Sequence, residues 1–170
     1  MKSMVDAFAS YARMPKAIIT ALDLNELVRD ILRLYDVKTL GVQLDLQENL
    51  PLIAGDSTLL RQVIHNLLQN AQDALADHIS PCVILHTEYQ HHTICLTIKD
   101  NGAGFPENLM ARLFEPYATT KAKGTGLGLA IVKKIVEEHQ GTIHIENIKP
   151  NGASIWIALP IYDADRERTQ

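Results

Sequence analysis

Hydrophobic residues recur at intervals of three and four in four parts of the chain, and this spacing predicts four amphipathic helices. The first covers residues 1 to about 14, and the second begins after Asp23. The third and longest follows Asp56 and covers roughly residues 57 to 77, and the fourth opens at Gly126. Both aspartates can accept hydrogen bonds from the free N–H groups of a first helical turn, so we expect them to be N-caps.

Hydrophobic and polar residues alternate in other parts of the chain, and this alternation predicts half-buried strands. The strands cover residues 42–46, 83–89, 93–99, 142–146 and 153–159. The order of elements is helix, helix, strand, long helix, hairpin, loop, helix and hairpin. Because only one face of each strand is apolar, we expect an α/β two-layer sandwich, in which helices cover one face of a mixed, mostly antiparallel sheet.

The composition is that of a soluble globular domain and excludes two classes of partner. The chain has 170 residues, 46% of them hydrophobic, which suffices for one sizeable core. Its net charge of -4 argues against a nucleic-acid surface, and the lack of a long apolar run argues against membrane contact. Cys82 and Cys95 fall on predicted strands without metal-like spacing, so we expect buried, reduced thiols and no zinc site.

The residues between Asp100 and Leu129 carry the strongest chemical signal. Two glycine clusters, 102–104 and 124–128, flank a loop between a predicted strand and a predicted helix, which is typical of a functional lid. Glycines let the backbone approach a ligand closely, and a helix N-terminus attracts anions. Lys121 adds positive charge there, and Asp100 can accept a hydrogen bond from an exocyclic amine such as that of adenine. Turn formation explains any one glycine pair, but the ordered set favours a nucleotide pocket.

The third predicted helix carries a polar edge made by Asn66, Asn70, Asp73 and Asp77. Asparagine is a mediocre helix former, so two of them beside an apolar stripe need a reason. A triphosphate needs a divalent cation, and a neutral amide oxygen can bind Mg²⁺ without repelling phosphate. Asn70 is therefore our candidate Mg²⁺ ligand, assisted by Asn66 one turn earlier. The alternative is that both asparagines only bind loop backbone at the edge of the core.

Several motifs, taken in order, carry a family resemblance. Residues 60–71, LRQVIHNLLQNA, resemble an N box, and residues 100–104, DNGAG, match a G1 box. Residues 113–121, LFEPYATTK, resemble an F box, and residues 124–129, GTGLGL, match a G2 box. Gly152 lies where a short final glycine motif is expected. Over about residues 24–160 the chain thus resembles the ATP-binding catalytic domain of sensor histidine kinases in the GHKL superfamily. The resemblance implies a Bergerat-type sandwich with an ATP lid, and ATP and Mg²⁺ as cofactors.

The same resemblance implies roles for individual residues. Asn66, Asn70 and Lys121 would be catalytic, with Asn70 holding Mg²⁺. Asp100 would bind the adenine amine, and the second glycine cluster would bind the phosphates. The full set expected to contact the nucleotide is Asn66, Asn70, Asp73, Asp100, Gly102, Gly104, Thr119, Thr120, Lys121, Gly124, Thr125, Gly126, Leu127, Gly128 and Leu129.

More narrowly, residues 8–15, FASYARMP, and residues 117–121 resemble nitrogen-regulation sensor kinases of the NtrY type. Residues 1–20 would then be the end of a dimerisation and phosphoacceptor helix with its linker, 21–160 the ATP-binding domain, and 161–170 a polar, frayed tail. The implied partners are the phosphoacceptor histidine domain of the same kinase and a downstream response regulator. The full-length kinase would be a homodimer, and this chain would lie in the cytoplasmic portion of a membrane-anchored sensor.

The chain departs from the family pattern at two points. None of its seven histidines is followed by Glu or Asp in the manner of a phosphoacceptor box, so it resembles a fragment with the ATP site and without the substrate histidine. The second departure is Asp73, because some relatives carry a basic residue beside the phosphates at this position.

The expected reaction is transfer of the γ-phosphoryl group of Mg-ATP to a histidine. Asn66 stands where ATPases of the superfamily place a glutamate that activates water, and an amide cannot act as that base. The alternatives are a GHKL ATPase or serine-directed kinase, or a nucleotide-binding interaction module without catalysis.

Overall fold

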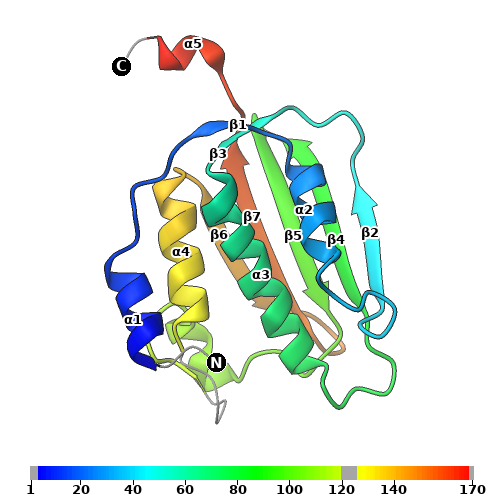
Figure 1. Cartoon of the computed structure of the whole chain (residues 1–170). Helices are drawn as coiled ribbons and strands as arrows, with labels where there is room; N and C mark the ends of the chain where they lie inside the picture. The colour runs from blue at the N-terminus through cyan, green and yellow to red at the C-terminus, as the bar shows by residue number, and fades with distance from the viewer. Residues whose placement is uncertain (1–3, 120–125, 169–170) are drawn as a thin grey trace.

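The computed structural model describes residues 4–119 and 126–168, and its centre is a five-stranded sheet with helices on one face (Figure 1). Across the sheet the strands are β2 (Val42–Leu46), β4 (Val83–Gln90), β5 (Thr93–Asp100), β7 (Ala153–Pro160) and β6 (Thr142–Asn147). β2 and β4 are parallel, and the other neighbours are antiparallel. The predicted sandwich with a mixed, mostly antiparallel sheet is therefore confirmed.

The main helices lie where the hydrophobic spacing predicts them. They are α1 (Met4–Ala12), α2 (Leu24–Leu32), α3 (Ser57–Ala74) and α4 (Gly128–Glu138). Two short helices were not predicted, the 3-10 helix η1 (Glu107–Arg112) and α5 (Ala164–Glu167), which lies within the segment expected to be frayed. Neither is long enough to show a clear hydrophobic period. No helix in the described ranges is long and apolar enough to cross a membrane.

A second, small sheet was also missed from the sequence. β1 (Thr20–Leu22) pairs antiparallel with β3 (Ile53–Gly55). Strands of this length are too short to show alternation in the sequence. Their pairing attaches the segment after α1 to the segment that leads into α3.

Asp56 is the N-cap of α3, as predicted, and it also joins three parts of the chain. Its carboxylate accepts hydrogen bonds from the N–H groups of Thr58 at 3.0 Å, Leu59 at 3.1 Å and Ile18 at 2.9 Å. Its own N–H donates to Nε2 of His139 at 2.9 Å. His139 is buried directly after α4, and its Nδ1 donates to a carbonyl of that helix at 2.7 Å. Burial raises the pKa of Asp56, but the backbone hydrogen bonds and His139 outweigh it, so the net pKa lies below its usual value.

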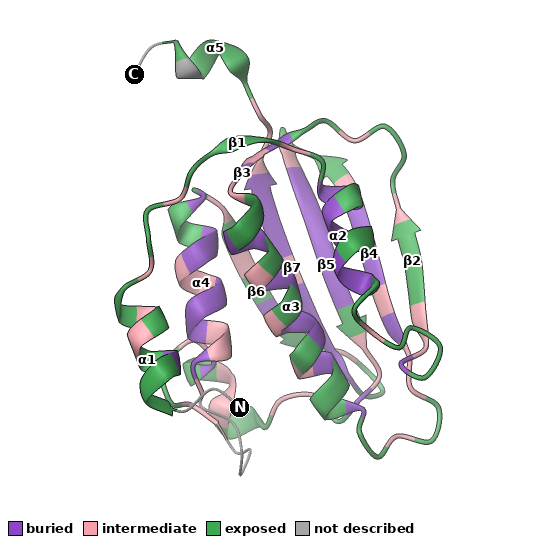
Figure 2. Cartoon of the chain, viewed as in Figure 1, coloured by how far each residue is buried: buried purple, intermediate pink, exposed green. Residues whose placement is uncertain are grey.

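The core lies between the helices and the near face of the sheet (Figure 2). α3 buries the predicted apolar stripe, which consists of Leu60, Val63, Ile64, Leu67, Leu68 and Ala71. Leu85, Ile98 and Ile155 lie side by side on adjacent strands and are buried in the same core. The end of α3 therefore lies close to the loop that follows β5. A Cβ at Gly102 of that loop would lie only 2.9 Å from the carbonyl oxygen of Ala74.

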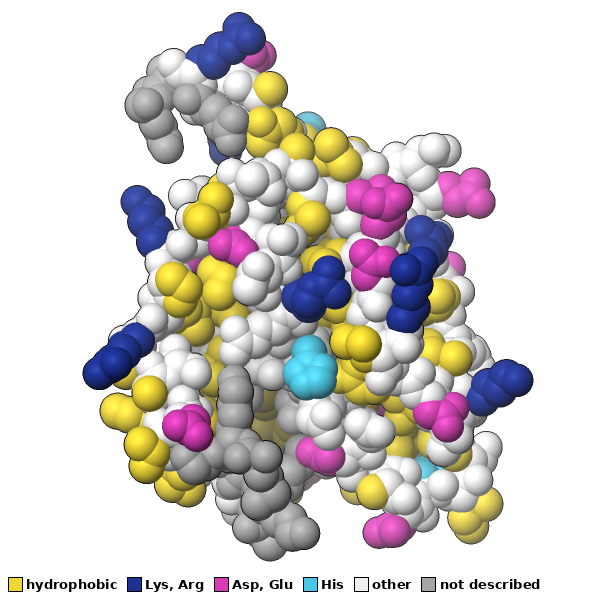
Figure 3. All heavy atoms as spheres, viewed as in Figure 1, with side chains coloured by type: hydrophobic (Ala, Val, Ile, Leu, Met, Phe, Trp, Pro, Cys, Tyr) yellow, Lys and Arg dark blue, Asp and Glu magenta, His cyan; other side chains and the backbone are white. Residues whose placement is uncertain are grey.

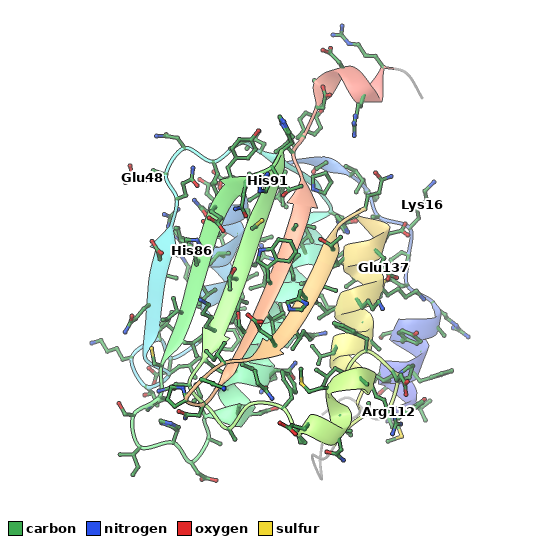
Figure 4. The ribbon with its side chains drawn as sticks, turned by 180° about the vertical axis from the view of Figure 1, so that it is seen from behind. Lys16, Glu48, His86, His91, Arg112 and Glu137 are labelled. Carbon is green, nitrogen blue, oxygen red and sulfur yellow. The ribbon has the colours of Figure 1, made fainter. Side chains whose placement is uncertain are left out.

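The opposite face of the sheet carries no helix in the described part of the chain (Figure 4). Cys95, Thr97 and Ser154 point to that face by strand alternation, yet all three are buried. They are small residues beside larger ones, and Thr97 has Trp156 as its cross-strand partner. The expectation of one buried face per strand is therefore wrong for β5 and β7. Burial raises the pKa of the Cys95 thiol, whereas Cys82 precedes β4 and is only partly buried, contrary to the prediction.

Candidate functional site

A cavity of about 310 Å³ lies between the C-terminal part of α3, the start of α4 and the end of β5. The loop after β5 forms a further wall. Of the residues expected to contact a nucleotide, those that line this cavity are Asn70, Asp73, Asp100, Gly104, Thr119, Gly126, Gly128 and Leu129. Segments far apart in the sequence therefore meet at one cavity of the size that small ligands occupy.

The other expected residues are not placed in the cavity wall. Asn66, Gly102 and Leu127 are described but are not among the lining residues. Thr120, Lys121, Gly124 and Thr125 lie outside the described residues. Lys121, the expected catalytic lysine, is in this last group, so the geometry below is built without it.

Asp100 is the last residue of β5, where it pairs with Ala153 of β7. Its Oδ1 accepts a hydrogen bond from the N–H of Gly102 at 2.9 Å. Burial raises the pKa of Asp100, and hydrogen bonds from the N–H groups of Gly102 and Ala153 partly offset this effect. The carboxylate thus has a fixed position in the wall and remains an acceptor for a ligand that carries an amine.

Two glycines shape the loop after Asp100. At Gly102 a Cβ would lie 2.9 Å from the carbonyl oxygen of Ala74, at the end of α3. At Gly104 the φ angle is +77°, and a Cβ would lie 2.7 Å from Oδ1 of Asn147. The loop can approach both neighbours only because these positions lack side chains.

The start of α4 provides the part of the wall suited to an anion. Leu127, the residue before the helix, is fully buried and has no side chain that could cap the first N–H groups. Gly126 has a φ of +70°, and its carbonyl accepts the N–H of Tyr117 at 2.9 Å. A Cβ at Gly128 would meet no atom within 4 Å among the described residues. Among the described residues nothing covers Gly128, so the first turn of α4 faces the cavity there, where a phosphate can be bound by backbone N–H groups.

α3 contributes polar side chains from its predicted edge. Asn70 and Asp73 line the cavity, and Oδ1 of Asp73 accepts a hydrogen bond from Gln69 Nε2 at 3.3 Å. Asn66 instead donates from Nδ2 to the carbonyl of Gly128 at 3.4 Å. This contact is of the backbone-binding kind that the sequence left open for Asn66, and it links α3 to the start of α4.

The donor set of the cavity fits Mg²⁺ better than a softer metal. The described residues contain no group of three or more His, Cys, Asp or Glu side chains that could hold a metal ion. Asn70 offers a neutral oxygen at the wall, close to the open helix start. Because Mg²⁺ keeps several waters and shares phosphate oxygens, one protein amide is a sufficient anchor for it.

The apolar part of the wall was not predicted. Ile98 and Ile155, neighbours on β5 and β7, line the cavity together with Ala103, Phe105 and Leu109. Strand alternation could have found Ile98, because it lies two residues before Asp100 on the same face. The loop residues give no periodic signal.

Comparison with known proteins places the chain in a family. Residues 55–163 match the family described as histidine kinase-, DNA gyrase B-, and HSP90-like ATPase. The nitrogen regulation protein NtrY of Azorhizobium caulinodans is 39% identical over 165 residues, which are 93% of this chain and 21% of that protein. The chain therefore spans about a fifth of the length of this curated relative.

Solved structures show the same fold. The catalytic domain of the histidine kinase ThkA is 30% identical, with a TM-score of 0.75 over 85% of this chain and 96% of that one. Full-length ShkA in complex with AMPPNP is 25% identical, with a TM-score of 0.77 over 95% of this chain and 36% of that one. ThkA in complex with the response regulator protein TrrA is 27% identical, with a TM-score of 0.75 over 94% of this chain and 46% of that one.

Proposed function

The chain belongs to the family of histidine kinase-, DNA gyrase B- and HSP90-like ATPases, as the ATP-binding catalytic domain of a sensor histidine kinase, and from this premise we propose that it transfers the γ-phosphoryl group of Mg-ATP to a histidine of a dimerisation domain. The observation that carries the proposal is the meeting of Asp100, Asn70 and the start of α4 at one cavity. These three elements suit the base, the cation and the phosphates of a single nucleotide.

Asp100 would recognise the adenine base. Its ionised carboxylate accepts a hydrogen bond from the exocyclic amine, and the bond from Gly102 N–H at 2.9 Å holds it in place. Ile98 and Ile155 would lie against the base and exclude water from that hydrogen bond.

The start of α4 would bind the phosphates. N–H groups near Gly126 and Gly128 donate to phosphate oxygens, and the hydrogen bond from Asn66 to the Gly128 carbonyl steadies that turn. Asn70 would hold Mg²⁺, which when bound neutralises phosphate charge. We propose further phosphate contacts from Thr119 and from four residues that lie outside the described ranges, namely Thr120, Lys121, Gly124 and Thr125. Of these, Lys121 would balance the charge that develops during transfer.

Transfer to histidine is favoured over hydrolysis by the residue at position 66. Activation of water needs a general base near the phosphates, and the Asn66 amide cannot accept a proton at neutral pH. The Asn66 side chain is also engaged with the Gly128 carbonyl. The same argument disfavours a GHKL ATPase, whereas a serine-directed kinase or a non-catalytic nucleotide-binding module is distinguished only by experiment.

The relatives support a proposal for the rest of the kinase. NtrY is far longer than this chain, so we propose that residues 1–20 continue a dimerisation and phosphoacceptor helix of a homodimeric kinase. Figure 3 shows hydrophobic side chains gathered over α1, where Met4, Val5 and Phe8 are exposed. We further propose a response regulator as the downstream partner, since ThkA is crystallised with one, and a role in nitrogen regulation in the cytoplasmic part of a membrane-anchored sensor.

Calorimetric titration with an unhydrolysable ATP analogue, with and without Mg²⁺, tests the pocket. The parent is expected to bind with Mg²⁺, and Asp100→Asn is expected to bind at least about tenfold more weakly, because a hydrogen bond to a charged group is lost. Asp77→Asn is the matched control, since it makes the same change at an exposed residue that follows α3 and does not line the cavity.

Activity is then tested by adding a phosphoacceptor histidine domain in trans and measuring acid-labile phosphate on it. Label on histidine that depends on Asn70 and Asp100 is the expected result. Binding without any transfer would favour the interaction module, and release of free phosphate alone would favour an ATPase. No binding by the parent would overturn the proposal.

A further inference from the structure

Asn147, the last residue of β6, lies outside the cavity and makes an unusual pair of contacts with the loop after β5. Its Oδ1 accepts a hydrogen bond from the N–H of Phe105 at 2.8 Å, and its Nδ2 donates to the carbonyl of Phe105 at 2.8 Å. Phe105 belongs to no strand. One side chain therefore gives this loop the two hydrogen bonds that a neighbouring strand would give.

The loop is shaped to allow this contact. Gly104 has a φ of +77°, and a Cβ there would lie 2.7 Å from Oδ1 of Asn147 and 2.9 Å from the carbonyl oxygen of Gly152. A side chain at position 104 would push the loop away from the amide. The glycine and the asparagine are thus complementary parts of one contact.

The two ends of the loop are held in different ways. Near Asp100, the side chain of Asn101 accepts the N–H of Cys82 at 2.8 Å and donates to the carbonyl of Ser80 at 2.9 Å. The next residues, 103–106, line the cavity, and Asn147, which does not line it, holds them through the backbone of Phe105. Freeing this contact would leave Asp100 in the sheet but let the adjoining wall move.

We propose that Asn147 is a positioning residue for nucleotide binding, which fixes the cavity wall beside Asp100 by clamping the backbone of Phe105. The inference rests on the proposed function, because the wall matters only if the cavity binds the base. A wall that must be ordered on binding costs affinity, whereas a wall ordered beforehand does not.

The test compares Asn147→Ala with the parent by calorimetric titration of the unhydrolysable ATP analogue with Mg²⁺. Asn147 is exposed, so the substitution removes two hydrogen bonds without opening a cavity in the core. We expect the Kd to rise about fivefold, because without the two hydrogen bonds the wall must be ordered on binding, and this costs part of their free energy. Asn108→Ala is the matched control, because Asn108 is an exposed asparagine of η1 that does not line the cavity.

Two further measurements separate positioning from general stability. Hydrogen exchange of the Phe105 amide is expected to accelerate in Asn147→Ala and to slow again when the analogue is bound. Asn147→Asp, which sets a carboxylate oxygen against the Phe105 carbonyl in place of the donor, is expected to raise the Kd at least as much as Asn147→Ala. Urea unfolding of each variant shows whether it is folded under the conditions of the titration.

The outcomes are distinct. If the parent binds and both Asn147 variants bind within twofold of it, the inference is overturned while the proposed function stands. A loss of stability with unchanged Kd has the same consequence, because it marks a structural role only. If the parent does not bind, the proposed function fails and the inference fails with it.

Discussion

Replacing Asp56 by alanine tests how much the junction at the start of α3 stabilises the fold. The carboxylate accepts hydrogen bonds from the N–H groups of Thr58, Leu59 and Ile18. The chain offers two matched controls. Asp23 caps α2 by accepting one such bond, from Glu26, and Asp163 caps the short helix α5.

The expected losses of unfolding free energy follow from the number of bonds. Removal of an N-cap carboxylate costs about 1 kcal/mol, which we expect for Asp23→Ala. The bond from Ile18 adds up to about 1 kcal/mol, so Asp56→Ala should cost about 2 kcal/mol. Asp163→Ala should cost less than about 0.5 kcal/mol, because α5 lies at the end of the chain and can fray. For a domain of this size, about 2 kcal/mol lowers the Tm by roughly 4–8 °C.

The pH dependence has a definite sign. The folded pKa of Asp56 lies below its usual value, so the carboxylate stabilises the fold above the unfolded pKa, and this stabilisation is lost as the pH falls through the folded pKa. The deficit of Asp56→Ala should therefore be full at neutral pH and shrink below about pH 4, where the unfolded carboxyl is protonated.

Urea unfolding followed by circular dichroism measures the unfolding free energy of all three alanine variants at neutral pH and below about pH 4. Asp56→Asn, which keeps an acceptor oxygen and loses the charge, should lie between the parent and Asp56→Ala. The reasoning is refuted if Asp23→Ala destabilises as much as Asp56→Ala, or if the Asp56→Ala deficit is the same in acid as at neutral pH.

Three further results are expected. Gly152→Ala should lose at least about 2 kcal/mol of unfolding free energy in urea titration, because φ is +121° and a Cβ would lie 2.0 Å from the carbonyl oxygen of Asp100. Gly128→Ala is the control and should retain or gain stability, since a Cβ there would meet no described atom within 4 Å. Parent-like stability of Gly152→Ala would contradict this reasoning. Cys82 should react with a thiol reagent in the native protein, whereas Cys95, buried and with a raised pKa, should react only on unfolding, as mass spectrometry would show. Asp100→Asn without nucleotide should be more stable than the parent at neutral pH, because the raised folded pKa of the carboxyl marks a cost that appears as the pH rises above its unfolded pKa; a thermal scan at neutral pH and near pH 4 should show the difference only in the former.

Much of the fold was predictable because it rests on long periodic segments. The stripe of α3 and the cap at Asp56 follow directly from residue spacing. β1 and β3 escaped because their pairing is between segments about thirty residues apart and too short to alternate. Cys82 was wrongly expected to be a buried strand residue, because it directly precedes β4 and the burial of a residue outside a strand depends on tertiary contacts that the sequence does not show.

The candidate site was predictable where chemistry demands particular residue types. Asp100, Asn70 and the glycines were found because an acceptor, an amide and missing side chains are each unusual in their setting. Asn147 was not found, since an exposed asparagine at a strand end reads as an ordinary turn residue. Its contact with Phe105 depends on how β6 and the loop after β5 meet, which is a tertiary property.

The hydrogen bond between Asp56 and His139 has a mechanical consequence. α3 and α4 run in opposite directions, so the start of one and the end of the other are joined here, while their other ends line the cavity (Figure 1). The two helices are therefore joined by this hydrogen bond at one pair of ends, and both contribute to the cavity wall at the other pair. Asn70 lies fourteen residues along α3 from Asp56, or roughly 21 Å at the rise of an α-helix, so a tilt of α3 by about 3° at this junction would shift the cavity wall by about 1 Å. The N–H of Ile18 donates to the same aspartate, so the segment that follows α1 is attached at the junction from which both helices run to the cavity.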